Sequence, residues 1–165
     1  MGNPQESSLA WLAGVIESEG TISVQVYTLP DGRVRVTPFV CVVNTDMAIL
    51  EEVFRQLTLL AKRSRPRRCK HKGTNLPSAA VRIDGIGCAE ILEAIRPFII
   101  GSKGKNADVV LAFIKDRKEN LLDRDALGRV KRKPYTVAQI NLICSIRTSK
   151  MAKSSETIRQ APNVI

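Results

Sequence analysis

The apolar pattern of this 165-residue chain changes its period at Thr21. Over residues 8–19 apolar side chains recur at helical spacing, and Ser7 or Ser8 is expected to cap this helix. From Thr21 onward apolar and polar side chains alternate, which is typical of a strand with one buried face. A helix that leads into such a strand predicts helices packed against a sheet.

The same combination of helix and strands occurs again further along the chain. A turn over residues 30–32 predicts that the first strand folds back as a β-hairpin. A second helix is expected after residues 44–46, where Thr45 or Asp46 can cap it. A basic stretch over residues 62–72 and a short strand follow. Further helices are expected at about 88–95, after residue 104 to about 119, at 136–147 and at 153–159.

This order predicts an α+β fold with an α-β-β-α-β-β-α core. Its sheet is expected to be four-stranded and antiparallel, with helices on the apolar face and the other face open. We expect one domain, with its core at about residues 8–119 and a C-terminal helical extension at about 120–165.

The charge balance indicates a polyanion as partner. The chain has 26 Lys and Arg against 16 Asp and Glu, a net charge of +10. Apolar runs are too short for a membrane span, and the N-terminus has no export signal, so we expect a cytoplasmic or organellar protein that is not secreted and has no membrane partner. One histidine and four widely spaced cysteines predict reduced thiols and no zinc site.

The polar face of the first hairpin is the expected contact surface. A cationic sheet face is costly to bury without a partner, and the grooves of duplex DNA offer one. An exposed strand face that contacts only water would show the same alternation. The candidate DNA contacts on this hairpin are Ser23, Gln25, Tyr27, Arg33, Arg35 and Thr37.

A strip of small residues runs along the first helix and ends in a carboxylate. Ala10, Ala13, Gly14 and Glu17 lie at positions i, i+3, i+4 and i+7, a pattern that lets a second helix come close. The chain has no second copy of the strip, so the expected partner is the same helix of a second subunit across a two-fold axis. Trp11 is expected to be a packing residue.

Glu19 lies in the last turn of this helix, where the helix dipole disfavours an anion. Two-fold symmetry would bring the two Glu19 carboxylates together, and they would repel each other unless cations intervene. Their hard oxygen atoms suit Mg²⁺, which also binds phosphate oxygens. The chain is therefore expected to hold half of a metal-dependent site that cleaves phosphodiesters.

The segment Leu12–Gly20 resembles the defining motif of the LAGLIDADG homing endonucleases, with Glu17 and Glu19 in place of two aspartates. Single-motif members of that family are homodimers that lay this type of sheet along the DNA major groove. The resemblance implies a site-specific endonuclease that cuts both strands of a long pseudo-palindromic DNA target and promotes mobility of its intron. It implies Mg²⁺ as the cofactor, with Mn²⁺ or Ca²⁺ able to substitute for binding.

The resemblance also implies roles for single residues around the metal. Glu19 matches the metal-binding acid, the backbone carbonyl of Ser18 a second ligand, and Glu17 an acid of the dimer interface. Asn44 resembles a residue that orders solvent near the scissile phosphate, although it could simply precede a helix cap. Lys103, with Lys105 as a rival, resembles a basic residue just before the long helix that contacts the solvent of the cleavage site.

Two further segments match DNA-contacting parts of the family. Residues 62–72 fall where a second DNA-binding hairpin belongs, although such a basic run is more often a solvated arm. Residues 154–159 resemble a C-terminal element that contacts the DNA backbone. The additional candidate contacts are Arg65, Arg67, Arg68, Lys70, Lys72, Arg82, Lys105, Ser154 and Ser155.

Two other functions are compatible with this scaffold. An RNA maturase would bind intron RNA and assist splicing, and a basic surface serves either polymer. A DNA-binding regulator without cleavage usually loses the motif acids. The joint presence of Ser18, Glu19 and Lys103 argues against such a regulator.

Overall fold

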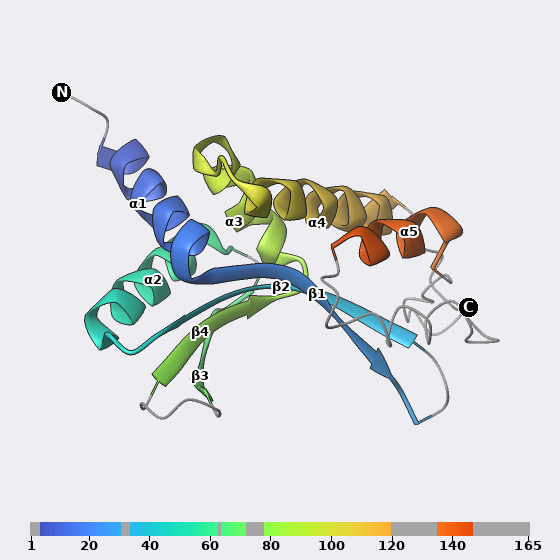
Figure 1. Ribbon diagram of the computed structural model, residues 1–165, viewed down its shortest axis with the longest axis horizontal. Helices are drawn as coiled ribbons and strands as arrows, with labels where there is room; N and C mark the ends of the chain where they lie inside the picture. The colour runs from blue at the N-terminus through green and yellow to red at the C-terminus, as the bar shows by residue number, and fades with distance from the viewer. Residues whose placement is uncertain (1–3, 31–33, 63, 72–77, 120–134, 147–165) are drawn as a thin grey trace.

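The computed structural model describes residues 4–30, 34–62, 64–71, 78–119 and 135–146. Its elements follow the expected order (Figure 1). They are α1 (Pro4–Glu19), β1 (Gly20–Thr28), β2 (Val34–Asn44), α2 (Met47–Leu60), β3 (Arg67–His71), β4 (Ser78–Asp84), α3 (Gly87–Ile95), the 3-10 turn η1 (Arg96–Phe98), α4 (Ser102–Glu119) and α5 (Val137–Ser145). The predicted α+β fold is confirmed.

The four strands form one antiparallel sheet in the order β1-β2-β4-β3. In Figure 1 the helices lie above this sheet, and its lower face is left uncovered by the described helices. Between β1 and β2, Gly20 pairs with Val42, and between β2 and β4, Cys41 pairs with Arg82. The pairing of β2 with β4 therefore joins the hairpin β1–β2 to the strands β3 and β4. The predicted sheet with one open face is confirmed.

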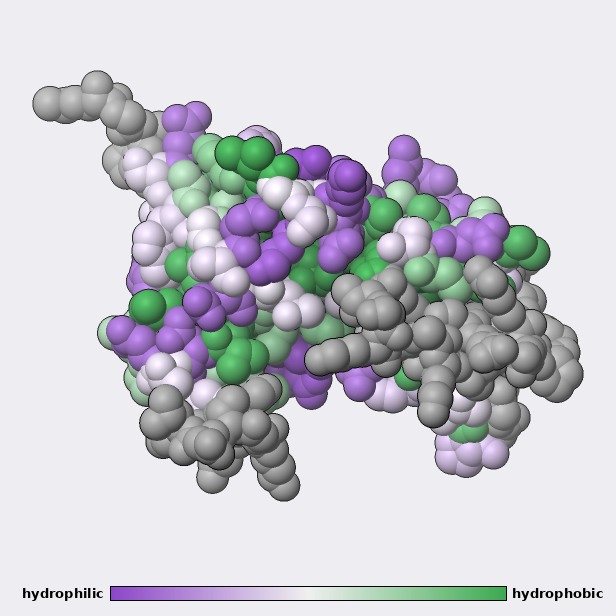
Figure 2. Space-filling view, in the orientation of Figure 1, coloured by the Kyte–Doolittle hydropathy of each residue, from purple (hydrophilic) through white to green (hydrophobic). Residues whose placement is uncertain are grey.

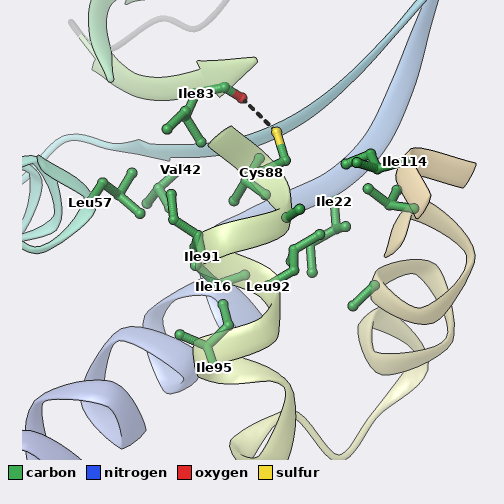
Figure 3. Close-up of a cluster of buried hydrophobic side chains, with 14 of the residues drawn as sticks. Ile16, Ile22, Val42, Leu57, Ile83, Cys88, Ile91, Leu92, Ile95 and Ile114 are labelled. Atoms are coloured by element: carbon green, nitrogen blue, oxygen red, sulfur yellow. Dashed lines mark hydrogen bonds between the residues drawn. The ribbon is translucent and has the colours of Figure 1, made fainter. Parts of the chain in front are cut away.

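The core lies between the sheet and the helices because the strands alternate with period two. Ile22, Val24, Val40 and Val42 are at most 1% exposed and point toward the helices. Figure 3 shows Ile91 and Leu92 of α3 beside Val42 and Ile22 of the sheet. The Cys88 thiol donates to the Ile83 carbonyl at 3.3 Å, and its burial raises its pKa to about 12.

The N-terminal caps of α2 and α5 agree with the prediction, and the start of α1 does not. The Asp46 carboxylate accepts from the Ala48 amide at 2.8 Å and caps α2, and Thr136 caps α5. Helix α1 already begins at Pro4, so the prediction that Ser7 or Ser8 caps it is wrong. No local rule required the helix to begin at those serines, since both are also tolerated inside a helix.

Several terminal predictions fall partly beyond the described residues. Helix α5 ends at Ser145, slightly before the expected 147, and the helix expected at 153–159 lies outside the described residues. Tyr135 joins the C-terminal part to the sheet, because its hydroxyl accepts from the Val36 amide at 2.9 Å. None of the helices in the described part of the chain has the length and apolarity that a membrane span requires.

Candidate nucleic-acid interface and metal site

Helix α1 passes directly into β1 at the end of the LAGLIDADG-like segment. Glu19, the last helical residue, is exposed, and Gly20 begins the strand. A Cβ atom at Gly20 would come within 2.6 Å of the Ile16 carbonyl oxygen and 2.7 Å of its Cα, so only glycine fits this junction. Gly20 therefore allows the chain to pass from helix to strand directly after Glu19.

Lys103 holds the C-terminal end of α1. Its Nζ donates to the carbonyl oxygens of Ile16 at 3.1 Å, Glu17 at 2.5 Å and Ser18 at 3.3 Å. These carbonyls belong to the last turn, which lacks intrahelical donors and carries the negative end of the helix dipole. Lys103 lies in the first turn of α4 and not before it, because α4 already begins at Ser102. Its ammonium group therefore lies 3.3 Å from the Ser18 carbonyl oxygen, which is the carbonyl predicted to bind the metal.

Glu17 is half-buried, and its Oε2 atom has no hydrogen-bond partner in the described part of the chain. Its other oxygen lies against Gly101, where a Cβ atom would collide with it. A buried carboxylate oxygen without a donor is costly, so the position calls for a further group. The interface role expected of Glu17 is compatible with this position.

The outer surface of α1 is lined by small and aromatic residues. Ala10 and Gly14 are exposed, and a Cβ atom at Gly14 would meet nothing within 4 Å. Trp11 is 37% exposed, and its role as a packing residue stays a prediction. Ile100 is 96% exposed, and Figure 2 shows hydrophobic surface over the segment between α3 and α4. The expectation for Ala13 is wrong, because it is 0% exposed and packs in the core of its own chain.

Asn44 is the last residue of β2. It lies at the end of the sheet where α1 passes into β1, two residues beyond Val42, the partner of Gly20. Its Oδ1 atom accepts from the Asp46 amide at 2.9 Å. This bond supports the residue that caps α2, which is the simpler of the two roles considered for Asn44. Its role in ordering solvent stays a prediction.

The open sheet face carries the side chains expected there. Ser23, Gln25 and Tyr27 of β1 and Arg35 and Thr37 of β2 occupy the positions that alternate with the buried ones. Phe39 and Cys41 continue the same row, although the sequence analysis did not single them out; extending the period of two along β2 would have found them. Burial raises the pKa of the Cys41 thiol. Arg33 lies outside the described residues.

Arg82 is the centre of a polar network on this face. Its Nε donates to the Asp84 carboxylate and a terminal nitrogen donates to Gln25 Oε1, each at 2.7 Å. The guanidinium carbon lies 4.0 Å from the centroid of the Phe39 ring. The second Asp84 oxygen binds Arg67 at 2.9 Å. The network spans all four strands.

The prediction for Arg68 is wrong, because its side chain lies on the helix-covered side of the sheet. It pairs with the buried Val81, forms a 2.5 Å ion pair with Glu51 of α2 and stacks over Phe54. Adjacent residues of a strand point to opposite faces, so Arg67 and Arg68 cannot both face the open side.

The other basic candidates are only partly described. Arg65 before β3 and Lys105 in α4 are exposed, and Lys70 lies in β3. The side chain of Lys70 is not among the described ones. The candidates Lys72, Ser154 and Ser155 lie outside the described residues.

The candidate metal donors are few and consist of oxygen. Within the described residues, no three His, Cys, Asp or Glu side chains gather in one place. The Glu19 carboxylate and the Ser18 carbonyl are the hard oxygen donors that Mg²⁺ prefers, and further oxygens would have to come from water, DNA or a second chain. The donor set fits Mg²⁺ in type and is incomplete in one chain.

Comparison with known proteins gives matches by structure alone. No protein-family model matches the sequence, and no curated protein matches it. The homing endonuclease I-CvuI, in complex with its target in the presence of Ca, superposes with a TM-score of 0.66 and 18% identity over 95% of this chain and 93% of its own. I-TnaI gives 0.61 and 15% over 98% of this chain and 99% of its own. The LAGLIDADG homing endonuclease I-GzeII, in complex with a DNA target, gives 0.61 and 17% over 95% of this chain and 50% of its own. The chain therefore has the LAGLIDADG homing endonuclease fold, as its Leu12–Gly20 motif predicts.

Proposed function

We propose that this chain is one subunit of a homodimeric endonuclease that cuts both strands of a long pseudo-palindromic DNA site with Mg²⁺ and so promotes the mobility of its intron. The observation that carries the proposal is the α1–β1 junction. There an exposed Glu19 ends the helix, Gly20 permits the turn into the sheet, and Lys103 supplies a cation beside it. Solved structures that share this fold include homing endonucleases in complex with DNA.

The outer surface of α1 supports the homodimer. Its small residues Ala10 and Gly14 would let a second α1 approach closely, and Trp11 and Ile100 would be withdrawn from water. A second subunit could also supply the hydrogen-bond donor that the buried Glu17 oxygen lacks in the described part of the chain.

The charge arrangement supports a metal between the two subunits. Paired Glu19 carboxylates, each at the negative end of a helix, need a cation between them. The I-CvuI complexes were obtained in the presence of Ca or Mg, which favours a divalent cation here, with Ca²⁺ or Mn²⁺ able to support binding. When bound, such an ion polarises a phosphate and activates a water.

The chain's own residues would bind and orient the DNA and stabilise charge. Lys103 would add positive charge as negative charge develops on the scissile phosphate. Asn44 would orient a water at the end of the sheet beside the α1–β1 junction. The open face, with Arg35 and Tyr27 exposed at its far end, would follow the major groove. Phosphate contacts would supply most of the affinity.

The test is cleavage of a duplex pool with a randomised centre and constant ends. With Mg²⁺, the wild type should release cut ends that share one pseudo-palindromic sequence. Glu19→Gln should bind the selected duplex in Ca²⁺ but cut it at least about a hundredfold more slowly, since the paired carboxylates are lost. Glu6→Gln, at the other end of α1, is the matched control and should cut normally.

The same assay separates the alternatives. Cutting by Glu19→Gln at the wild-type rate would refute the metal site. Binding of the host intron RNA without any DNA cutting by the wild type would replace the endonuclease with an RNA maturase. Selective DNA binding without cutting would replace it with a regulator.

A further inference from the structure

We propose that Gln25 excludes cytosine at one position of each half-site, because Arg82 fixes its amide so that it presents a hydrogen-bond donor to the base. The inference rests on the proposed function, since it assumes that the open sheet face lies in the major groove. It concerns a contact between two side chains, and not the metal site or the dimer.

Arg82 is firmly held before any DNA arrives. Two of its nitrogens bind the Asp84 carboxylate at 2.7 Å, its guanidinium stacks on Phe39, and only 16% of its side chain is exposed. Asp84 is itself held by Arg67 at 2.9 Å. If Arg82 swung out to contact a base, it would lose these contacts together. Arg82 is therefore a positioning residue rather than a direct base contact.

The Arg82–Gln25 bond fixes the direction of the Gln25 amide. A guanidinium group has only donors, so the amide atom that faces it at 2.7 Å must be the oxygen. A flipped amide would place two donors against each other beside a positive charge. The Gln25 Nε2 group, with two hydrogens to donate, therefore points away from Arg82 and remains for a ligand.

The fixed amide suits three bases and disfavours the fourth. In the major groove guanine, adenine and thymine each present at least one acceptor, whereas cytosine presents only its N4 amino donor. Arg82 beside the Gln25 oxygen opposes the approach of another donor. The base that meets Gln25 should therefore be any base except cytosine.

The neighbouring contacts carry no such restriction. Ser23 and Tyr27 lie on the same strand face, and their hydroxyl groups rotate and both donate and accept. A donor-only preference should therefore appear at the Gln25 position alone among the three.

The experiment compares the base preferences of variants in the randomised duplex pool, with binding in Ca²⁺ as the readout. Wild type should deplete cytosine about tenfold or more at one position of each half-site. Gln25→Glu, which has only acceptors, should reverse this and favour cytosine or adenine over guanine and thymine. Arg82→Met should free the amide to flip and reduce the depletion to about twofold or less. Arg67→Met removes a partner of Asp84 and a candidate DNA contact, so it should weaken binding overall, but it leaves the bond to Gln25 in place and should keep the depletion of cytosine.

The outcomes separate this inference from the proposed function. If the wild type selects no common sequence, DNA recognition itself fails, and the inference falls with it. If the wild type selects a sequence but admits cytosine at the position that Gln25→Glu alters, only the inference is overturned. An unchanged profile in Gln25→Glu, whose fold is checked by its thermal midpoint, overturns it as well.

Discussion

Replacing Lys103 by methionine should destabilise the protein, because it removes the cation that caps the C-terminal end of helix α1. The Lys103 ammonium contacts three carbonyl oxygens of the last turn at 2.5–3.3 Å and is half-buried. A methionine of similar length keeps the apolar stem and loses all three bonds.

The magnitude follows from two overlapping effects. Hydrogen bonds from charged groups contribute about 1.5–3 kcal/mol, and a cation at a helix C-terminus contributes up to about 2 kcal/mol in a partly buried position. Water can replace part of the contact with Ser18, which is exposed. We therefore expect a loss of about 2 kcal/mol, which lowers Tm by about 4–8 °C in a domain of this size.

The assay is thermal and urea unfolding at one fixed protein concentration, so that any dimerisation affects all variants equally. Lys105→Met is the matched control, because Lys105 lies in the same helix and is exposed; it should change stability by less than about 0.5 kcal/mol. Equal stability of the two variants would refute the capping role of Lys103.

Four other outcomes test the packing and the open face. Leu92→Ala should cost about 3 kcal/mol in urea unfolding, since Leu92 is 0% exposed; a cost below about 1 kcal/mol would contradict its place in the core. Asp46→Ala should cost about 1 kcal/mol by removing the cap of α2, and an unchanged midpoint would argue against that cap. Cys88 should resist an aromatic disulfide reagent at neutral pH until the protein unfolds, because burial raises its pKa to about 12; labelling of the native protein, followed by mass spectrometry, checks this. Arg35→Ala should weaken DNA binding and reduce its salt dependence by about one phosphate contact, whereas Arg68→Ala should leave both unchanged.

The alternation of side chains predicted the open face well. Every described hairpin residue proposed as a DNA contact, such as Ser23 or Arg35, lies on that face, because a period of two relates sequence to face directly. The same rule applied to the basic stretch would have excluded Arg68. The charge of that stretch indicates a polyanion but does not say which face of the sheet each side chain takes.

Contacts between distant elements could not be predicted. Lys103 meets the end of α1 across more than eighty residues of sequence, and Arg82 reaches Gln25 on another strand. No local pattern encodes such pairs, since they depend on how the elements pack. Ala13 shows the same limit, because helical spacing alone does not decide where the buried stripe of α1 ends.

The homodimer is tested most directly by the mass of the protein on its selected duplex, measured by sedimentation equilibrium in Ca²⁺. Two chains per duplex are expected for the wild type. Gly14→Leu should keep the fold, since the described structure leaves the space beside Gly14 empty, but it should prevent α1 from meeting its partner and abolish double-strand cutting. One chain per duplex for a wild type that cuts both strands, or full cutting by Gly14→Leu, would contradict the shared site.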